Sequence, residues 1–204
     1  MKLPLILTLF RIVLSPLFVA LYLLGGERGA YPLALPYLLL LIVIVCEISD
    51  ALDGFFARRN NQVTNLGKVL DPMADSFFRL SVFFAFTQGI LQIPLWIVIV
   101  FFWRDSLVNT LRALFALEGI ALAARVSGKI KAILQAVVMI CILLGMIGYA
   151  HDAVTIETLK RVSRFLTTVA AIYTFCSGCE YLWISRVFLQ SALGISQKTF
   201  PKSL

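Results

Sequence analysis

Six long runs of apolar residues alternate with short polar or glycine-containing segments along the chain. The runs cover approximately residues 1–24, 33–58, 66–86, 94–117, 127–149 and 155–189. An α-helix rises about 1.5 Å per residue, so about 20 apolar residues cross the roughly 30 Å hydrocarbon layer of a bilayer. Gly25 and Gly89, which suit helix ends, and Thr64 or Asn65, which can cap a helix, fall between the runs. The pattern predicts an all-α protein with six transmembrane helices.

The composition also indicates a membrane protein. Of the 204 residues, 60% are hydrophobic and 14% are charged, and the mean hydropathy is +0.93. Soluble domains are about half apolar and about a quarter charged. We therefore expect one integral membrane domain over residues 1–204. The formal net charge of +7 does not indicate nucleic-acid binding, because no basic run is interleaved with aromatic residues.

The positions of the basic residues predict the orientation in the membrane. Most of them lie on the side shared by the two chain ends and by the second–third and fourth–fifth loops: Lys2, Arg11, Arg58, Arg59, Lys68, Arg112, Arg125, Lys129, Lys131, Arg186, Lys198 and Lys202. The opposite side carries Arg28, Lys160, Arg161 and Arg164. Since basic loops stay cytoplasmic, we predict a multi-pass protein of the cell (inner) membrane with both termini in the cytoplasm. The N-terminal run lacks a convincing cleavage site and is expected to remain as the first helix.

The four cysteines lie inside the apolar runs, at Cys46, Cys141, Cys176 and Cys179. The last two form a CxxC pair, but a zinc site would need a second pair of ligands nearby. We therefore expect all four cysteines to be small, buried apolar side chains.

Four aspartates stand in two pairs around the second–third loop. Asp50 and Asp53 are three residues apart and Asp71 and Asp75 are four apart, so each pair lies on one face of a helix. We expect the two helices to pack side by side and bring both pairs to one depth. Four like charges in apolar surroundings need cations to neutralise them. Carboxylate ligands suit Mg²⁺ or Mn²⁺ rather than zinc, so the stretch predicts a site for one or two such ions at the cytoplasmic edge of the membrane.

Residues beside the aspartates suit a phosphorylated ligand. Gly54 and Ala57 are small enough for a flat group to approach the backbone. Arg58 offers a donor fork for phosphate or carboxylate. Acids elsewhere in the predicted helices, Glu47, Asp105 and Glu180, are also functional candidates, because carboxylates are costly there. His151 lies on the opposite side and is expected to be a solvated turn residue.

The spacing Asp50-x2-Asp53-Gly54-x2-Ala57-Arg58-x8-Gly67-x3-Asp71-x3-Asp75 resembles, position for position, the signature of the CDP-alcohol phosphatidyltransferase family. The resemblance implies transfer of a phosphatidyl group from CDP-diacylglycerol to an alcohol, with release of CMP. It also implies a homodimer.

The family pattern implies a role for each residue of the signature. Asp50, Asp53, Asp71 and Asp75 would bind the metal, and Asp75 would also be the catalytic base. The group that would contact CDP consists of Asp50, Gly54, Ala57, Arg58 and Gly67.

Further similarity covers most of the chain and concerns the acceptor. The start Pro4-x3-Thr8-x2-Arg11 and the segments 59–68, 70–75, 104–112, 128–131 and 177–181 resemble family members that use sn-glycerol 3-phosphate. The resemblance therefore implies this acceptor, and guanidinium and ammonium groups suit its phosphate. The candidates to hold it are Arg104, Arg112, Lys129 and Lys131, and Thr8, Arg11, Glu47 and Arg79 are further candidates for the pocket.

Some of these residues have a second interpretation. Arg112, Lys129 and Lys131 could equally be basic charges of a cytoplasmic loop. Arg104 lies deeper in a predicted helix, which favours a function.

The sequence departs from the pattern of those members at Leu5, Glu47, Ser76, Arg79 and Asp105. Because these changes surround the acceptor half of the pocket, the main alternative is the same chemistry with inositol phosphate, serine, choline or phosphatidylglycerol as acceptor. Glu47 is about one turn before Asp50 and Arg79 about one turn after Asp75, so on antiparallel helices they reach similar depth. We predict that Glu47 and Arg79 form an ion pair beneath the aspartates.

Two functions of other classes are weaker alternatives. A metal transporter would spread its acids along a path through the bilayer, whereas these acids gather on one side beside glycine and arginine. A catalytically inactive relative does not fit either, because all four aspartates are present.

Overall fold

The computed structural model describes residues 3–26, 33–59, 65–117 and 125–192, and the side chains within residues 9–25, 33–49, 73–115 and 125–186. The described residues form six α-helices and no strand, which confirms the predicted all-α class. The helices are α1 (Leu3–Gly26), α2 (Ala34–Arg59), α3 (Asn65–Ala85), α4 (Leu95–Leu117), α5 (Val126–Ala150) and α6 (Ile156–Ala192). Each begins and ends within a few residues of its predicted run, because the apolar runs stop where glycine and polar residues begin.

The six helices differ in how well their length and composition support the expected six membrane spans. Among the described residues, α5 is the one helix long and apolar enough to cross a membrane by composition. Shorter apolar stretches occupy Leu9–Gly25 in α1 and Ala34–Ser49 in α2. In α4, Arg104, Asp105 and Arg112 interrupt the apolar run.

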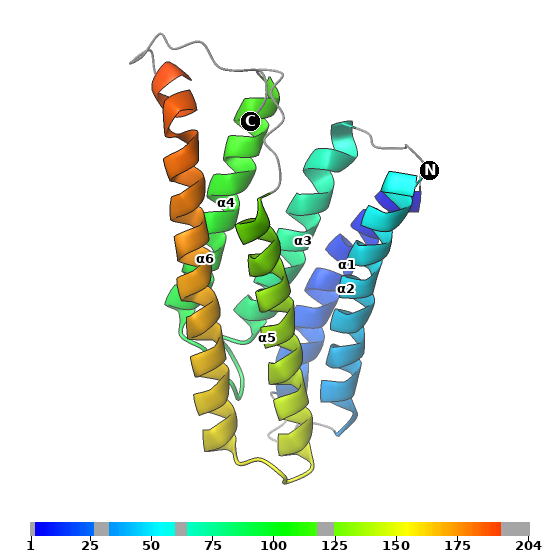
Figure 1. The fold of residues 1–204 in the computed structure, drawn as a ribbon. Helices are drawn as coiled ribbons and strands as arrows, with labels where there is room; N and C mark the ends of the chain where they lie inside the picture. Colours follow the sequence, from blue (N-terminus) through cyan, green and yellow to red (C-terminus); the bar gives the residue numbers. More distant parts are fainter. Residues whose placement is uncertain (1–2, 27–32, 60–64, 118–124, 193–204) are drawn as a thin grey trace.

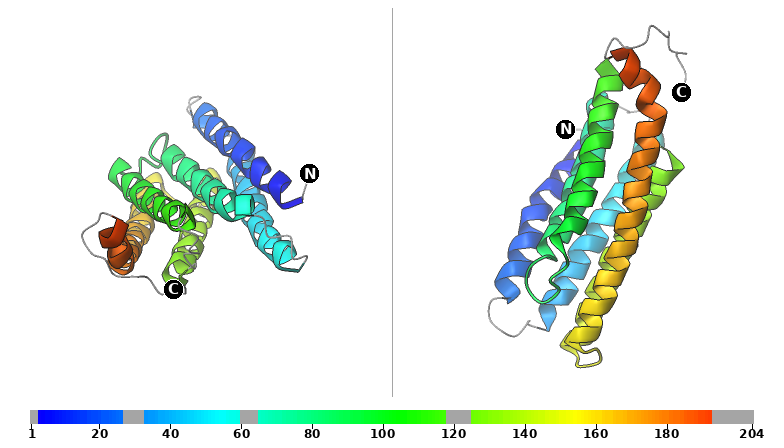
Figure 2. Two further views of the ribbon diagram at one scale, coloured as in Figure 1. Left: turned by 90° about the horizontal axis from the view of Figure 1, so that it is seen from above. Right: turned by 90° about the vertical axis from the view of Figure 1, so that its left-hand side faces the viewer.

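The helices form a ring. Going around it, α1 packs on α2, α2 on α5, α5 on α6, α6 on α4, α4 on α3, and α3 on α1 again. Seen along the bundle, the left view of Figure 2 shows the six helices in this order. The ends of α2, α4 and α6 and the starts of α3 and α5 lie at one end of the bundle (Figure 1). The helix ends that carry Arg58, Arg59, Arg112 and Lys129 are thus at a single end.

The core joins α1, α3 and α4 through aromatic side chains. Phe18, Phe83 and Phe101 are completely buried. The rings of Phe83 and Phe101 lie 4.8 Å apart between centroids, and the ring of Phe18 meets that of Phe86 edge-on at 6.2 Å. Offset and edge-on pairs of this kind stabilise a core beyond their buried area.

The outer surface is apolar as well. Large side chains such as Phe102 and Phe165 are exposed, and Trp183 is 67% exposed. Soluble monomers rarely expose wide apolar patches, so the surface fits a lipid environment.

Two predictions about single residues have different outcomes. Cys46 is buried, as expected, but Cys141, Cys176 and Cys179 are exposed on the outer faces of their helices, so the expectation of four buried cysteines is wrong. All four are free thiols. His151 is exposed at the end of α5, as expected, and its Nε2 lies 2.8 Å from the hydroxyl oxygen of Tyr37.

Candidate active site

Glu47 on α2 and Arg79 on α3 form a two-point ion pair. Arg79 donates from Nε to Glu47 Oε1 at 3.1 Å and from Nη2 to Oε2 at 3.0 Å. Arg79 is buried and Glu47 is partly buried. The predicted pair is confirmed.

This ion pair sets the relative height of α2 and α3. Asp50 lies three residues beyond Glu47 on α2, and Asp75 lies four residues before Arg79 on α3. Both steps lead toward the same end of the bundle, since the two helices run in opposite directions. Asp50 and Asp75 are therefore at similar heights, one turn above the ion pair.

The two helices meet in a different way from the one expected. In the described part of the chain, α2 packs mainly on α1 and α5, and α3 packs mainly on α1 and α4. Long side chains such as Glu47 and Arg79 bridge α2 and α3, so the expectation of direct packing side by side is wrong.

Asp75 is held by an ion pair with Arg11 of α1, from its Oδ1 to the Nη1 of Arg11. Arg11 is 1% exposed, whereas the Asp75 side chain is 19% exposed. Cys46, Glu47, Phe78 and Arg79 complete a small cavity around the pair. The ion pair with the buried guanidinium holds the carboxylate toward α1.

The remaining signature aspartates are described by backbone alone. Asp50 and Asp53 lie in α2 and Asp71 lies in α3, all in continuous helix, so the spacing that places each pair on one face is retained. Among the described side chains, no cluster of three or more potential metal ligands occurs. The donor chemistry of the signature, carboxylates alone, fits a hard divalent cation.

A second polar group lies between α4, α5 and α6. The ammonium of Lys131 donates to both oxygens of Asp105 at 2.8 Å each. Arg104 donates from Nη1 to Asp105 Oδ1 at 3.1 Å. All three residues are buried, with Lys131 3% exposed. The interpretation of Lys131 as a loop charge therefore does not fit the structure.

Two side chains of α6 also contact Arg104. Arg104 donates from Nη2 to Ser177 Oγ at 3.2 Å and lies over the Tyr181 ring, 5.3 Å from its centroid. Gly128 of α5 makes the approach feasible, because a Cβ there would lie 3.1 Å from the Tyr181 hydroxyl and 3.2 Å from Arg104 Nη2.

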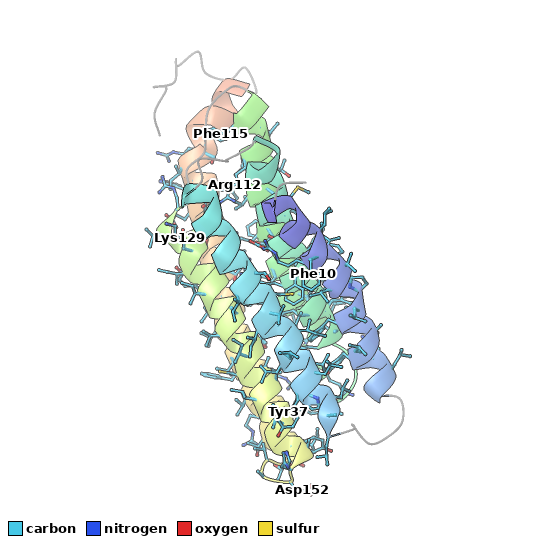
Figure 3. The ribbon with its side chains drawn as sticks, turned by 90° about the vertical axis from the view of Figure 1, so that its right-hand side faces the viewer. Phe10, Tyr37, Arg112, Phe115, Lys129 and Asp152 are labelled. Carbon is cyan, nitrogen blue, oxygen red and sulfur yellow. The ribbon has the colours of Figure 1, made fainter. Side chains whose placement is uncertain are left out.

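The other basic residues proposed for the acceptor phosphate are more exposed to solvent. Lys129 is exposed and Arg112 is partly buried, and Figure 3 shows both toward the same end of the bundle, far from Tyr37 and Asp152. Their positions fit either interpretation, a phosphate contact or a loop charge. Arg125 donates to Glu180 at 3.5 Å, which ties the start of α5 to α6.

Several predicted site residues have no described side chain: Thr8, Asp50, Asp53, Gly54, Ala57, Arg58, Gly67 and Asp71. Conversely, the role of Asp105 as the shared partner of Lys131 and Arg104 was not predicted. The sequence feature that could have indicated this role is the position of Asp105 next to Arg104 inside an apolar run.

Comparisons with known proteins identify the family. The family model for CDP-alcohol phosphatidyltransferase matches residues 1–188. A protein of Bacillus subtilis (strain 168) named CDP-diacylglycerol--glycerol-3-phosphate 3-phosphatidyltransferase is 32% identical over 186 residues, which is 88% of this chain and 93% of the relative.

Proteins of the same name in two other bacteria are also similar. The one from Shigella flexneri serotype 5b (strain 8401) is 31% identical over 92% of this chain and 97% of its own length. The one from Haemophilus influenzae (strain ATCC 51907 / DSM 11121 / KW20 / Rd) is 29% identical over 91% and 94%. With the family model covering nearly the whole chain, this protein belongs to the CDP-alcohol phosphatidyltransferase family.

Proposed function

We propose that this protein transfers the phosphatidyl group of CDP-diacylglycerol to sn-glycerol 3-phosphate, forming phosphatidylglycerophosphate and releasing CMP. The shared name of relatives that align over most of the chain supports this substrate pair. The structural observation that supports the proposal is the Glu47–Arg79 pair, because it joins α2 to α3 about one turn from Asp50 and Asp75.

Asp50, Asp53, Asp71 and Asp75 are proposed to hold Mg²⁺ or Mn²⁺ at that level. Such an ion, when bound, offsets charge on the pyrophosphate and on the departing CMP. The Asp75 carboxylate also faces Arg11, so it would be shared between the ion and a guanidinium.

Asp75 is proposed as the base that takes the proton of the acceptor hydroxyl. A base must be ionised and correctly directed before the acceptor arrives. The buried Arg11 supports this role, because its guanidinium pairs with the Asp75 carboxylate and holds it in place.

The CDP group is proposed to lie against the α2–α3 end of the bundle. Asp50, Gly54, Ala57, Arg58 and Gly67 are the residues assigned to it by the family signature. The glycines permit close approach to the backbone, and Arg58 can pair with a phosphate.

The acceptor phosphate is proposed to bind near Arg104 and Lys131, with Arg112 and Lys129 contributing toward the end of the bundle. Arg104 and Lys131 share one carboxylate, Asp105, so the three side chains together carry one net positive charge. A buried net charge favours an anionic partner, which supports glycerol 3-phosphate over a neutral alcohol.

We further propose that all six helices span the cell (inner) membrane with both termini in the cytoplasm, as a single domain that forms a homodimer. A lipid-tailed donor could then stay in the bilayer while a polar acceptor enters from water. The apolar outer surface supports this arrangement.

The test is an acceptor comparison with purified protein and CDP-diacylglycerol. CMP release is measured with glycerol 3-phosphate, inositol phosphate, serine, choline or phosphatidylglycerol. We expect release with glycerol 3-phosphate and a lipid product that carries a second phosphate. Preferential release with another acceptor would replace the substrate assignment and keep the reaction class.

A further inference from the structure

The group of Arg104, Asp105 and Lys131 joins α4 to α5 and, through Ser177, to α6. The acid of this group in the described part of the chain is Asp105. Both cations depend on that acid, since Lys131 uses both of its oxygens and Arg104 uses Oδ1.

One donor in this group is still unused. Arg104 Nε is buried and has no hydrogen-bond partner among the described residues. A buried donor without an acceptor costs about 1–3 kcal/mol. Together with the net positive charge of the three side chains, this donor indicates that the group is arranged for an additional anion.

We infer that Asp105 is the positioning residue of the acceptor site: it holds the Lys131 ammonium and the Arg104 guanidinium in the geometry that receives the acceptor's phosphate. The inference rests on the proposed function, because it assumes an anionic acceptor. Asp105 itself would not contact that acceptor, since carboxylate and phosphate repel each other.

The physical reason is the burial of two cations side by side. Without Asp105, Arg104 and Lys131 would be neighbouring like charges in a buried site with no anion between them. Lys131 would then turn away or give up its proton, and the site would lose the charge that attracts phosphate.

The experiment compares Asp105→Asn, Lys131→Gln, the double variant and Asp105→Glu with the wild-type protein. Asp152→Asn is the matched control, because Asp152 is exposed in the turn after α5, toward the opposite end of the bundle from Lys129 (Figure 3). For each protein, KM for glycerol 3-phosphate, KM for CDP-diacylglycerol, kcat and the melting temperature in detergent are measured.

We expect Asp105→Asn to raise KM for glycerol 3-phosphate about tenfold or more while KM for CDP-diacylglycerol changes less than about twofold. Asp105→Glu keeps the charge and should recover much of the acceptor affinity. The double variant should be no worse than the poorer single variant, since residues that act as one unit are not additive. The control should match the wild type.

Three results would overturn the inference. In the first, Asp105→Asn lowers only the melting temperature or kcat and leaves KM for glycerol 3-phosphate unchanged, which would make Asp105 merely structural. In the second, the effects of the two single changes multiply in the double variant. In the third, Asp105→Asn does not fold, and Asp105→Glu folds but has the same KM for glycerol 3-phosphate as Lys131→Gln. Restoring the negative charge would then not restore the affinity for the acceptor. Absence of CMP release with glycerol 3-phosphate in the wild type would instead contradict the proposed function, and it is seen before any variant is compared.

Discussion

Asp75 is the signature acid whose side chain the structure describes, and its contacts support the proposed role of a base. It is paired with the buried Arg11 on one side and remains partly open on the other. This combination holds the carboxylate in place without burying it completely. The chemistry of the site therefore depends on α1 as well as on the two helices that carry the aspartates.

Replacing this base gives the first prediction. Asp75→Asn should lower kcat by at least about 100-fold, because general bases contribute about 10²–10⁴-fold. Binding of CDP-diacylglycerol should largely persist, since Asp50, Gly54, Ala57 and Arg58 are unchanged. Asp152→Asn is the control and should have normal turnover. Near-normal turnover of Asp75→Asn would exclude Asp75 as the base.

The Glu47–Arg79 pair gives the second prediction. Glu47→Gln removes a charge from two hydrogen bonds of a buried arginine and should lower the free energy of unfolding by about 2 kcal/mol. Thermal unfolding in detergent measures this, with the exposed Glu157→Gln as control. Equal melting temperatures for the two variants would mean that the pair does not fix the register of α2 and α3.

Among single-residue contacts, the sequence predicted the Glu47–Arg79 ion pair but not the Asp105–Lys131 ion pair. Glu47 and Arg79 flank aspartates whose common depth already followed from helix spacing. Asp105 and Lys131 lie on α4 and α5, and their contact depends on how each helix is rotated about its own axis. The exposed Cys141, Cys176 and Cys179 were missed for the same reason.

Among the elements, the boundaries of all six helices followed from the apolar runs, because water-exposed turns demand glycine or polar residues. The neighbours of each helix did not follow. α2 packs on α5 rather than directly on α3, since side-chain shape and not sequence order decides which surfaces fit. The structure therefore changes the expected site from a contact between two helices to a space bordered by α1, α2 and α3.

The contact between α4 and α6 gives the third prediction. A Cβ at Gly178 would lie 2.8 Å from the Trp103 ring and 3.2 Å from Arg104 Cγ. Gly178→Val should therefore destabilise the protein by about 2 kcal/mol through overpacking. Melting temperatures are compared with those of Cys179→Ala, a change at the exposed neighbouring position. A melting temperature for Gly178→Val as high as that of Cys179→Ala would show that α4 and α6 do not approach closely there.

For the whole molecule, the ring of helices has two unlike ends. One end carries the ends of α2 and α4 and the starts of α3 and α5, and the other carries the α5–α6 turn with His151 and Asp152 (Figures 1 and 3). The basic residues predict that the first of these ends faces the cytoplasm.

The fourth prediction tests this orientation. On a background with the four native cysteines replaced by alanine, Asp152→Cys should react with an impermeant maleimide in intact cells. Ser196→Cys should react only after the cells are permeabilised. The reverse pattern would invert the proposed topology and place the aspartates on the outer side.

The most direct measurement of the central claim is CMP release by the purified protein from CDP-diacylglycerol and glycerol 3-phosphate, with and without divalent cations. Release should be supported by Mg²⁺ or Mn²⁺, should stop when a chelator is added, and should return when either ion is restored in excess. Release that continues at the same rate in the chelator would contradict the proposal that the aspartates of α2 and α3 act through a bound metal ion.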